Sequence, residues 1–120
     1  MVVVESAVES IAIKRVPMVE VLVRGQLDAV SAPRVHDVLE QAMLLSPDEL
    51  IIDLADCPSI DAAGIMLLLD THRRAVRNGG VVALRSPSPR LSRNLKLAHV
   101  DRVLKVIWPG PHAGCAAGAG

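Results

Sequence analysis

The central region of the chain carries side chains that could perform acid–base chemistry. Asp53, Asp56 and Asp61 lie close together in sequence, and His72 follows them. A carboxylate beside an imidazole is a common arrangement for general acid–base catalysis. Each residue also has a structural explanation, which we favour. Asp61 is a strong candidate for a helix N-cap, and His72 falls on a helix face directed towards a sheet. We therefore expect a protein that is not an enzyme.

The short motifs of nucleophilic and phosphate-binding sites are also missing. Ser31 and Ser88 are explained as helix N-caps. There is no Gly-x-Ser-x-Gly elbow and no Gly-x-x-x-x-Gly-Lys loop. The histidines and cysteines lack the paired spacing of metal ligands. We expect no cofactor and no metal.

The most informative stretch is a buried strand that leads directly into a helix. Leu50 to Leu54 is a short apolar run, and the turn around Pro58 separates it from a helix that starts at Asp61. The first turn of that helix reads Asp61-Ala62-Ala63-Gly64. Backbone donors and a partial positive charge gather at such a helix start, so it favours an anion or a polar group of a partner. We take this turn as the candidate site.

Composition narrows the function further. The chain has 120 residues, is 51% hydrophobic, and balances thirteen basic against thirteen acidic residues. Its single aromatic residue is Trp108, so it lacks both the positive field and the stacking side chains of a nucleic-acid-binding protein. No apolar run approaches the ~20 residues of a membrane span, and the N-terminus does not resemble a signal peptide. We expect a cytoplasmic protein that binds no nucleic acid and does not insert into a membrane.

The hydrophobic pattern predicts strands alternating with helices. Strands are expected at Ile11–Val16, Val19–Arg24, Leu50–Leu54, Val81–Leu84 and Val103–Ile107. Pro17 is expected to mark the turn between the first two, and Pro47 to stop the first helix. Three helices are expected after Ser31, Asp61 and Ser88. Their inward residues are, in order, Val35, Val38, Leu39, Ala42 and Met43; Ile65, Leu68, Leu69, His72 and Val76; and Leu91, Leu95 and Ala98.

This order predicts one α/β domain over residues 1–108, with helices packed on a mixed sheet of four to five strands. Residues 109–120 contain only small residues, proline, one histidine and one cysteine, which is typical of a disordered tail. Arg90, Arg93 and Lys96 form a basic stripe on the third helix, which we interpret as a solvated face.

Cys57 lies in the turn that feeds the candidate site. A free, partly buried structural thiol is the interpretation we favour, because cysteines of a reducing compartment are usually unpaired. A redox switch with Cys115 in the tail is the alternative.

The chain resembles the STAS domain family, and within it the bacterial anti-sigma factor antagonists, from about Val19 to Val106. Three segments carry the resemblance. They are Val23-Arg24-Gly25-Gln26-Leu27-Asp28-Ala29-Val30-Ser31-Ala32, then Ile51-Ile52-Asp53-Leu54 with Ile60-Asp61-Ala62-Ala63-Gly64-Ile65, and finally Leu95-Lys96-Leu97-Ala98-His99-Val100-Asp101-Arg102-Val103-Leu104.

The resemblance implies a partner-switching protein that binds an anti-sigma factor, usually an ATP-binding serine kinase, and so frees a sigma factor. In the family the kinase phosphorylates a serine of an Asp-Ser-Ser/Thr-Gly loop, and the phosphate breaks the complex. Here Ala62 occupies that position and Ala63 the next. The resemblance thus implies an antagonist that is constitutively competent or is regulated otherwise: by Ser59 phosphorylation, Cys57 redox chemistry, ligand binding or abundance.

The expected partner surface combines the loop from Leu27 to Ser31 with the loop from Cys57 to Gly64. Its residues are Asp28, Ser31, Cys57, Ser59, Asp61, Ala62, Ala63 and Gly64. Two other functions stay open. One is a STAS scaffold subunit of an ABC lipid-transport complex or a stressosome. The other is a nucleotide-binding protein that uses the helix N-terminus for a phosphate.

Overall fold

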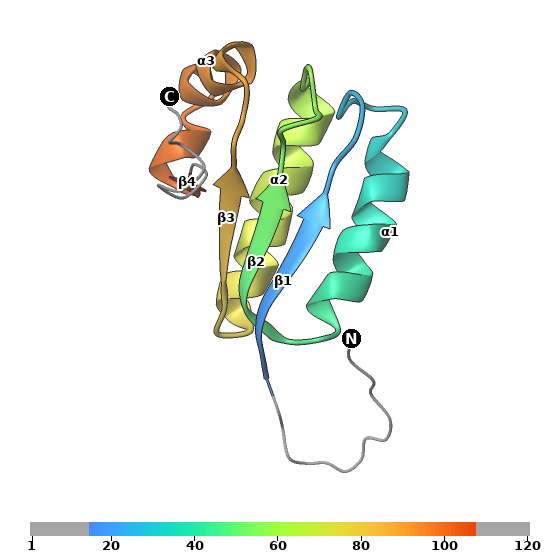
Figure 1. The fold of residues 1–120 in the computed structure, drawn as a ribbon, viewed down its shortest axis with the longest axis vertical. Coiled ribbons are helices and arrows are strands. Elements are labelled where there is room, and N and C mark those ends of the chain that lie inside the picture. The colour runs from blue at the N-terminus through green and yellow to red at the C-terminus, as the bar shows by residue number, and fades with distance from the viewer. Residues whose placement is uncertain (1–14, 108–120) are drawn as a thin grey trace.

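The computed structural model describes residues 15–107, which form a four-stranded sheet with helices against it (Figure 1). The strands are β1 (Val16–Leu22), β2 (Pro47–Asp53), β3 (Val81–Arg85) and β4 (Lys105–Ile107). The helices are α1 (Ala32–Met43), α2 (Ala62–Arg77), α3 (Pro89–Leu97) and the short 3-10 helix η2 (Val100–Arg102). The prediction of a single α/β domain with four to five strands is confirmed. The four described strands are all parallel, where a mixed sheet was expected.

Strand order in the sheet follows chain order, β1-β2-β3-β4, and every neighbouring pair is parallel. Parallel neighbours need a crossover, and α1, α2 and α3 supply the three crossovers. The strand expected over Ile11–Val16 lies mostly outside the described residues, as does the tail 109–120.

One face of the sheet forms the core together with the helices. The register aligns Val21, Ile52 and Leu84 in one row and Leu50 and Val82 in another. All five are buried, and Leu39 and Leu68 pack in the same cluster from α1 and α2. Strand residues alternate between faces, so Met18, Leu22 and Val81 project from the opposite face, where each is about half exposed.

Several local predictions were wrong, and packing explains them. Pro17 lies inside β1 instead of marking a turn, because an edge strand tolerates a residue without an N–H group. Pro47 is the first residue of β2, and α1 already ends at Met43. The expected last strand is divided: Val100–Arg102 is a 3-10 helix, and β4 starts only at Lys105.

The buried faces of the helices also differ from the predicted stripes. In α2 the buried residues are Gly64, Leu67, Leu68, Thr71 and Ala75, whereas Val76 is 53% exposed and His72 half-buried. Small residues permit closer packing, and the Thr71 hydroxyl is satisfied because it donates to the Leu67 carbonyl at 2.8 Å. Val38 on α1 and Ala98 after α3 are likewise exposed.

Candidate functional site

The candidate site lies where β1 and β2 end and their chains continue side by side. Beyond β1, the amide of Gly25 donates to the Asp56 carbonyl at 3.0 Å, and the amide of Leu27 donates to the Ser59 carbonyl at 3.0 Å. Leu27 and Ile60 then form an isolated parallel bridge. Both side chains are buried, which anchors each loop to the core. The two expected site loops are thus one extension of the sheet.

Asp61 connects the second loop to the first and also caps α2. One carboxylate oxygen, Oδ1, accepts from the Gly64 amide at 3.0 Å, as the cap prediction required. The other, Oδ2, accepts from the Ala29 amide at 3.2 Å. In addition, the Asp61 amide donates to the Leu27 carbonyl at 3.1 Å. One residue therefore fixes the start of α2 against the loop that precedes α1.

Asp28 organises that first loop. Its Oδ1 accepts from the amides of Val30 and Ser31, both at 3.0 Å. The backbone hydrogen bond from Ser31 is the largest of the influences that lower the pKa of Asp28 below its ordinary value of 3.8. The carboxylate is thus held in its charged form at the end of the sheet, where Asp28 is half-buried.

Ser31 occupies the position before α1, but the prediction that its side chain caps the helix was wrong. Its hydroxyl makes no cap hydrogen bond. It donates instead to the Gln26 carbonyl at 2.7 Å and accepts from the Asp28 amide at 3.1 Å. Ser31 therefore closes the Gln26–Ser31 loop on itself.

The first turn of α2 presents small residues to solvent. Ala62 is exposed, Ala63 is half-buried, and Ser59 is half-buried before them. Gly64 faces inward. A Cβ atom at this position would lie 2.6 Å from the Leu27 carbonyl oxygen and 2.7 Å from Cγ1 of Ile60. Glycine is required here because the helix and the first loop approach so closely.

The family model for the STAS domain matches residues 10–111, which is most of the chain. The chain belongs to the STAS domain family. Its candidate site is the turn Asp61-Ala62-Ala63-Gly64. This turn lies beyond the end of β2 and is hydrogen-bonded to the first loop through Leu27 and Ala29.

Solved structures of the same fold come from several bacteria. A candidate anti-sigma factor antagonist from Thermotoga maritima is 22% identical over 83% of this chain and 87% of that chain, with a TM-score of 0.71. An anti-sigma factor antagonist from Mycobacterium paratuberculosis is 23% identical over 80% of each chain, with a TM-score of 0.69. A sulfate transporter family protein from Wolinella succinogenes is 22% identical over 78% of this chain and 80% of that chain, with a TM-score of 0.65.

Cys57 does not reach the surface of this STAS domain. Its side chain is 1% exposed, and its thiol donates to the Ser59 carbonyl at 3.3 Å. Burial raises the pKa of the thiol, because the thiolate would lose its hydration. Cys57 is a free structural thiol, and Cys115 lies outside the described residues.

The residues that could have formed a catalytic site do not converge. Asp53 accepts from Arg85 across the sheet, and Asp56 is exposed in the turn. His72 lies ten positions after Ala62 on α2, which places it about 15 Å along the helix axis at 1.5 Å per residue. Within residues 15–107, no group of three or more potential ligands could hold a metal ion, and no helix is long and apolar enough to cross a membrane.

Two apolar residues of this region were missed by the sequence argument. Val30 is 86% exposed at the tip of the first loop, and Met66 is 54% exposed on α2. Met66 lies four residues after Ala62, so both are on the same face of the helix. An apolar residue inside a polar loop, as in Asp28-Ala29-Val30-Ser31, was the signal that could have identified Val30.

Proposed function

We propose that this STAS domain is an anti-sigma factor antagonist that acts in the cytoplasm as a binding module. Its partner surface comprises Asp28, Val30, Ser59, Asp61, Ala62 and Met66. The observation that carries the proposal is the exposed Ala62 at the start of α2, held beside the first loop by the bond from Ala29 to Asp61. Exposed apolar side chains rimmed by carboxylates are typical of a protein–protein interface.

The proposed partner is an anti-sigma factor of the ATP-binding serine kinase type. A phosphorylated residue at the start of α2 would place close to two negative charges beside Asp61 and Asp28. Ala62 has no hydroxyl to phosphorylate, so it keeps the surface small and uncharged at that position. Binding is therefore constitutive or is controlled elsewhere. Redox control at Cys57 is not part of the proposal because that thiol is buried.

A second candidate is a scaffold role in a membrane transport complex. The likeness to the sulfate transporter family protein from Wolinella succinogenes favours it. In that role the same surface would contact a transporter subunit. The two candidate functions therefore differ in the protein that this surface binds.

An affinity pull-down from the native cytoplasm tests the interface. Wild type is compared with Ala62→Glu, and the captured proteins are identified by mass spectrometry. We expect wild type to recover an ATP-binding anti-sigma factor and Ala62→Glu to lose it, because an uncompensated charge buried in an interface is strongly unfavourable. Ala98→Glu, an equal change at an exposed alanine after α3, is the matched control and should bind like wild type.

The same experiment separates the alternatives. Recovery of a transporter subunit would assign the scaffold role, and equal binding by Ala62→Glu would refute this interface. Ala62→Ser tests the switch itself: with the captured kinase and ATP it should gain one phosphate and dissociate, whereas wild type should stay unmodified and bound. An Ala62→Ser protein that is phosphorylated yet remains bound would contradict the proposed location of the contact.

A further inference from the structure

The charges of the chain are divided unequally between its two halves. Residues 1–70 contain four basic and twelve acidic residues, whereas residues 71–120 contain nine basic residues and one acidic residue, Asp101. Such asymmetry indicates a partner of strong opposite charge, such as nucleic acid or a membrane surface. Because strand order follows chain order, the two halves form opposite sides of the sheet, with α1 at one edge and α3 and β4 at the other (Figure 1).

Five of these basic side chains lie on three neighbouring elements, α3, η2 and β4, and we call them the basic face. They are Arg90, Arg93, Lys96, Arg102 and Lys105. Each is exposed, and none forms an ion pair with another described residue. In contrast, carboxylates neutralise Arg73, Arg74 and Arg85. The positive charge of the basic face is therefore available to a partner.

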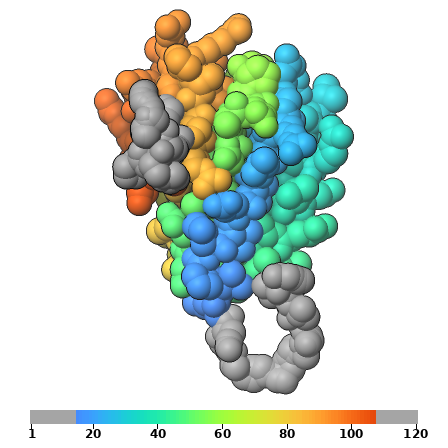
Figure 2. All heavy atoms as spheres, in the orientation of Figure 1, coloured from blue at the N-terminus to red at the C-terminus, as the bar shows by residue number. Residues whose placement is uncertain are grey.

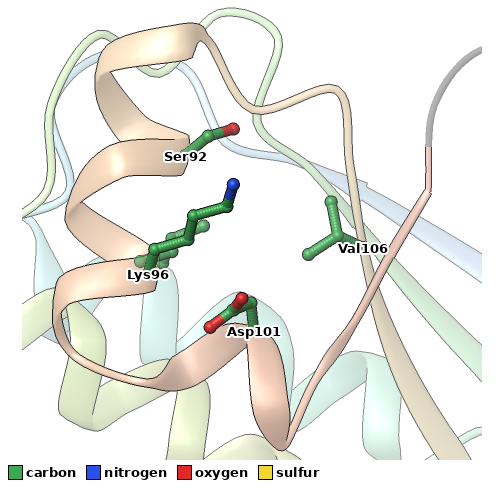
Figure 3. Close-up of a pocket in the computed structure, with 5 residues that line it drawn as sticks. Ser92, Lys96, Asp101 and Val106 are labelled. Carbon is green, nitrogen blue, oxygen red and sulfur yellow. The ribbon is translucent and has the colours of Figure 1, made fainter.

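The one carboxylate of this region does not neutralise the basic face. Asp101 lies on η2, across a pocket from Lys96 (Figure 3). The Lys96 amino group extends towards Ser92 and away from Asp101, and the two charges form no ion pair (Figure 3). Domain surfaces usually intersperse both signs of charge, and a field of one sign attracts an oppositely charged partner.

Exposed aliphatic side chains accompany these charges. Leu97 is 74% exposed, and Val103 is 50% exposed directly after η2. Arg90, Arg93 and Leu97 follow spacings of three and four residues, so they share the outer stripe of α3, away from its buried residues. Phosphates of a nucleic acid would leave the aliphatic groups without a contact, and protein interfaces are depleted in lysine. Basic and aliphatic side chains together match the headgroup region of an anionic membrane.

We propose that the basic face binds the surface of an anionic lipid bilayer, without a helix crossing it. Its five cations contact lipid phosphates, while Leu97 and Val103 enter the boundary between headgroups and acyl chains. The same surface repels the acidic half of the chain, which orients the domain with α3 towards the lipid and α1 away from it. The basic face shares no residue with the candidate partner surface, so the proposal does not depend on which protein the domain binds.

Co-sedimentation of the whole 120-residue chain with lipid vesicles tests the proposal. We expect binding at ~0.1 M salt to phosphatidylcholine vesicles that contain about 30% phosphatidylglycerol, but not to pure phosphatidylcholine, because each basic residue near an anionic surface strengthens binding about fivefold. At ~1 M salt the screening length falls from about 10 Å to about 3 Å, and binding should weaken at least about tenfold. Equal binding to both vesicles, or none to the anionic ones, would overturn the proposal.

Charge reversal locates the contact. The double variant Arg90→Glu/Arg93→Glu should bind anionic vesicles at least about twentyfold more weakly than wild type. Arg24→Glu/Arg34→Glu is the matched control, because both arginines are exposed, lie on the acidic side of the sheet and form no ion pair with a described residue. Equal weakening of the two double variants would show that net charge, and not this face, governs binding. If a variant fails to fold, the vesicle and salt series on wild type still decides.

A third variant separates a lipid surface from an acidic protein surface. Leu97→Gln keeps every charge but removes an exposed aliphatic group. It should weaken vesicle binding at least about threefold, because less apolar surface is then buried in the bilayer. Binding of soluble poly-L-glutamate, which offers charge alone, should not change. Undiminished vesicle binding by Leu97→Gln would show that the basic face recognises charge alone and would overturn the lipid assignment in favour of an acidic protein.

Discussion

Asp61 illustrates how one side chain can combine a local role with a long-range one. A carboxylate at a helix start needs only one oxygen for the cap. Here the second oxygen accepts from Ala29, 32 residues earlier in the chain. The cap follows from local sequence, whereas the bond to Ala29 depends on the pairing of β1 with β2. The stability of α2 and the position of the first loop are therefore coupled at this residue.

Replacing Asp61 by alanine should be more destabilising than removing an ordinary cap. Ser88 is the matched control, because its side chain accepts only from the Leu91 amide at the start of α3. We expect Ser88→Ala to lower the free energy of unfolding by about 1 kcal/mol. Asp61→Ala should lower it by about 2 kcal/mol, since it removes the cap and the bond between loops. Urea unfolding curves measure both, and equal losses would contradict the bridging role.

Asp28 should contribute stability that depends on pH. Its pKa is lowered in the folded chain, so the folded state binds its proton less readily than the unfolded state. The contribution is then complete above the ordinary value of 3.8 and is lost as pH falls through the lowered folded value. Asp28→Asn keeps an acceptor but removes the charge. Wild type should exceed Asp28→Asn in unfolding midpoint at pH 6, and this advantage should shrink as pH falls below 3.8. An advantage that does not change with pH in this range would exclude the charge as its source.

At the scale of elements, three strands are connected by one arginine. Arg85 on β3 donates from Nη1 to Glu20 on β1 at 2.9 Å, and from Nε to Asp53 on β2 at 3.0 Å. The hydrogen bonds that Arg85 donates, first to Glu20 and second to Asp53, raise its pKa above the ordinary value. Glu20 is 42% exposed, whereas the Asp53 side chain is only 17% exposed. The Asp53 contact should therefore matter more for stability, because water compensates it less.

Removing one partner of Arg85, and in a second variant Arg85 itself, tests this difference. Glu20→Gln should lower the free energy of unfolding by at most about 1 kcal/mol, as for an exposed ion pair. Arg85→Met should lower it by about 2 kcal/mol, because it leaves the Asp53 carboxylate half-buried without its cation. Chemical denaturation at low and high salt provides the measurement. Because Arg85→Met removes both contacts, a loss no larger than that of Glu20→Gln would show that the Asp53 contact adds nothing.

Sequence reasoning succeeded where a residue acts through its neighbours in the chain. The caps at Asp61 and Ser88 and the buried strand at Leu50 are of this kind, as each depends on a few adjacent residues. It failed for Ser31, whose hydroxyl prefers the Gln26 carbonyl to the helix start. The prediction of the buried face of α2 was also wrong. Gly64, Thr71 and Ala75 are buried because neighbouring segments pack closely against these small side chains, and not because the residues are strongly hydrophobic. Such contacts depend on tertiary packing.

At the scale of the whole molecule, the described core is built from aliphatic side chains around β2 and β3. Figure 2 shows the strands at the front of the molecule, with α1 along one side. Cys57 belongs to the same core cluster as Leu54 and Ile60. Its thiol can reach solvent only when the surrounding loops and core open, so its reactivity reports on the integrity of the fold.

Alkylation of Cys57 by iodoacetamide should therefore be slow in the native protein. In a Cys115→Ser background we expect a rate at least about a hundredfold below that in concentrated guanidinium, because burial restricts access and the raised pKa disfavours the thiolate. Mass spectrometry of the modified peptide measures the rate. Asp61→Ala should accelerate it, since that change releases the loop from Ser59 to Gly64. Equal native and denatured rates would show that Cys57 is accessible.

The agreement between strand order and chain order has a consequence for synthesis on the ribosome. Each new strand pairs with the one made just before it, so no strand must wait for a distant segment to find its neighbour. A domain generally folds as a unit, and its chain is synthesised at about 5–20 residues per second. Each of these four strands therefore leaves the ribosome after the neighbour with which it pairs, and the sheet is ready to close as soon as β4 has emerged.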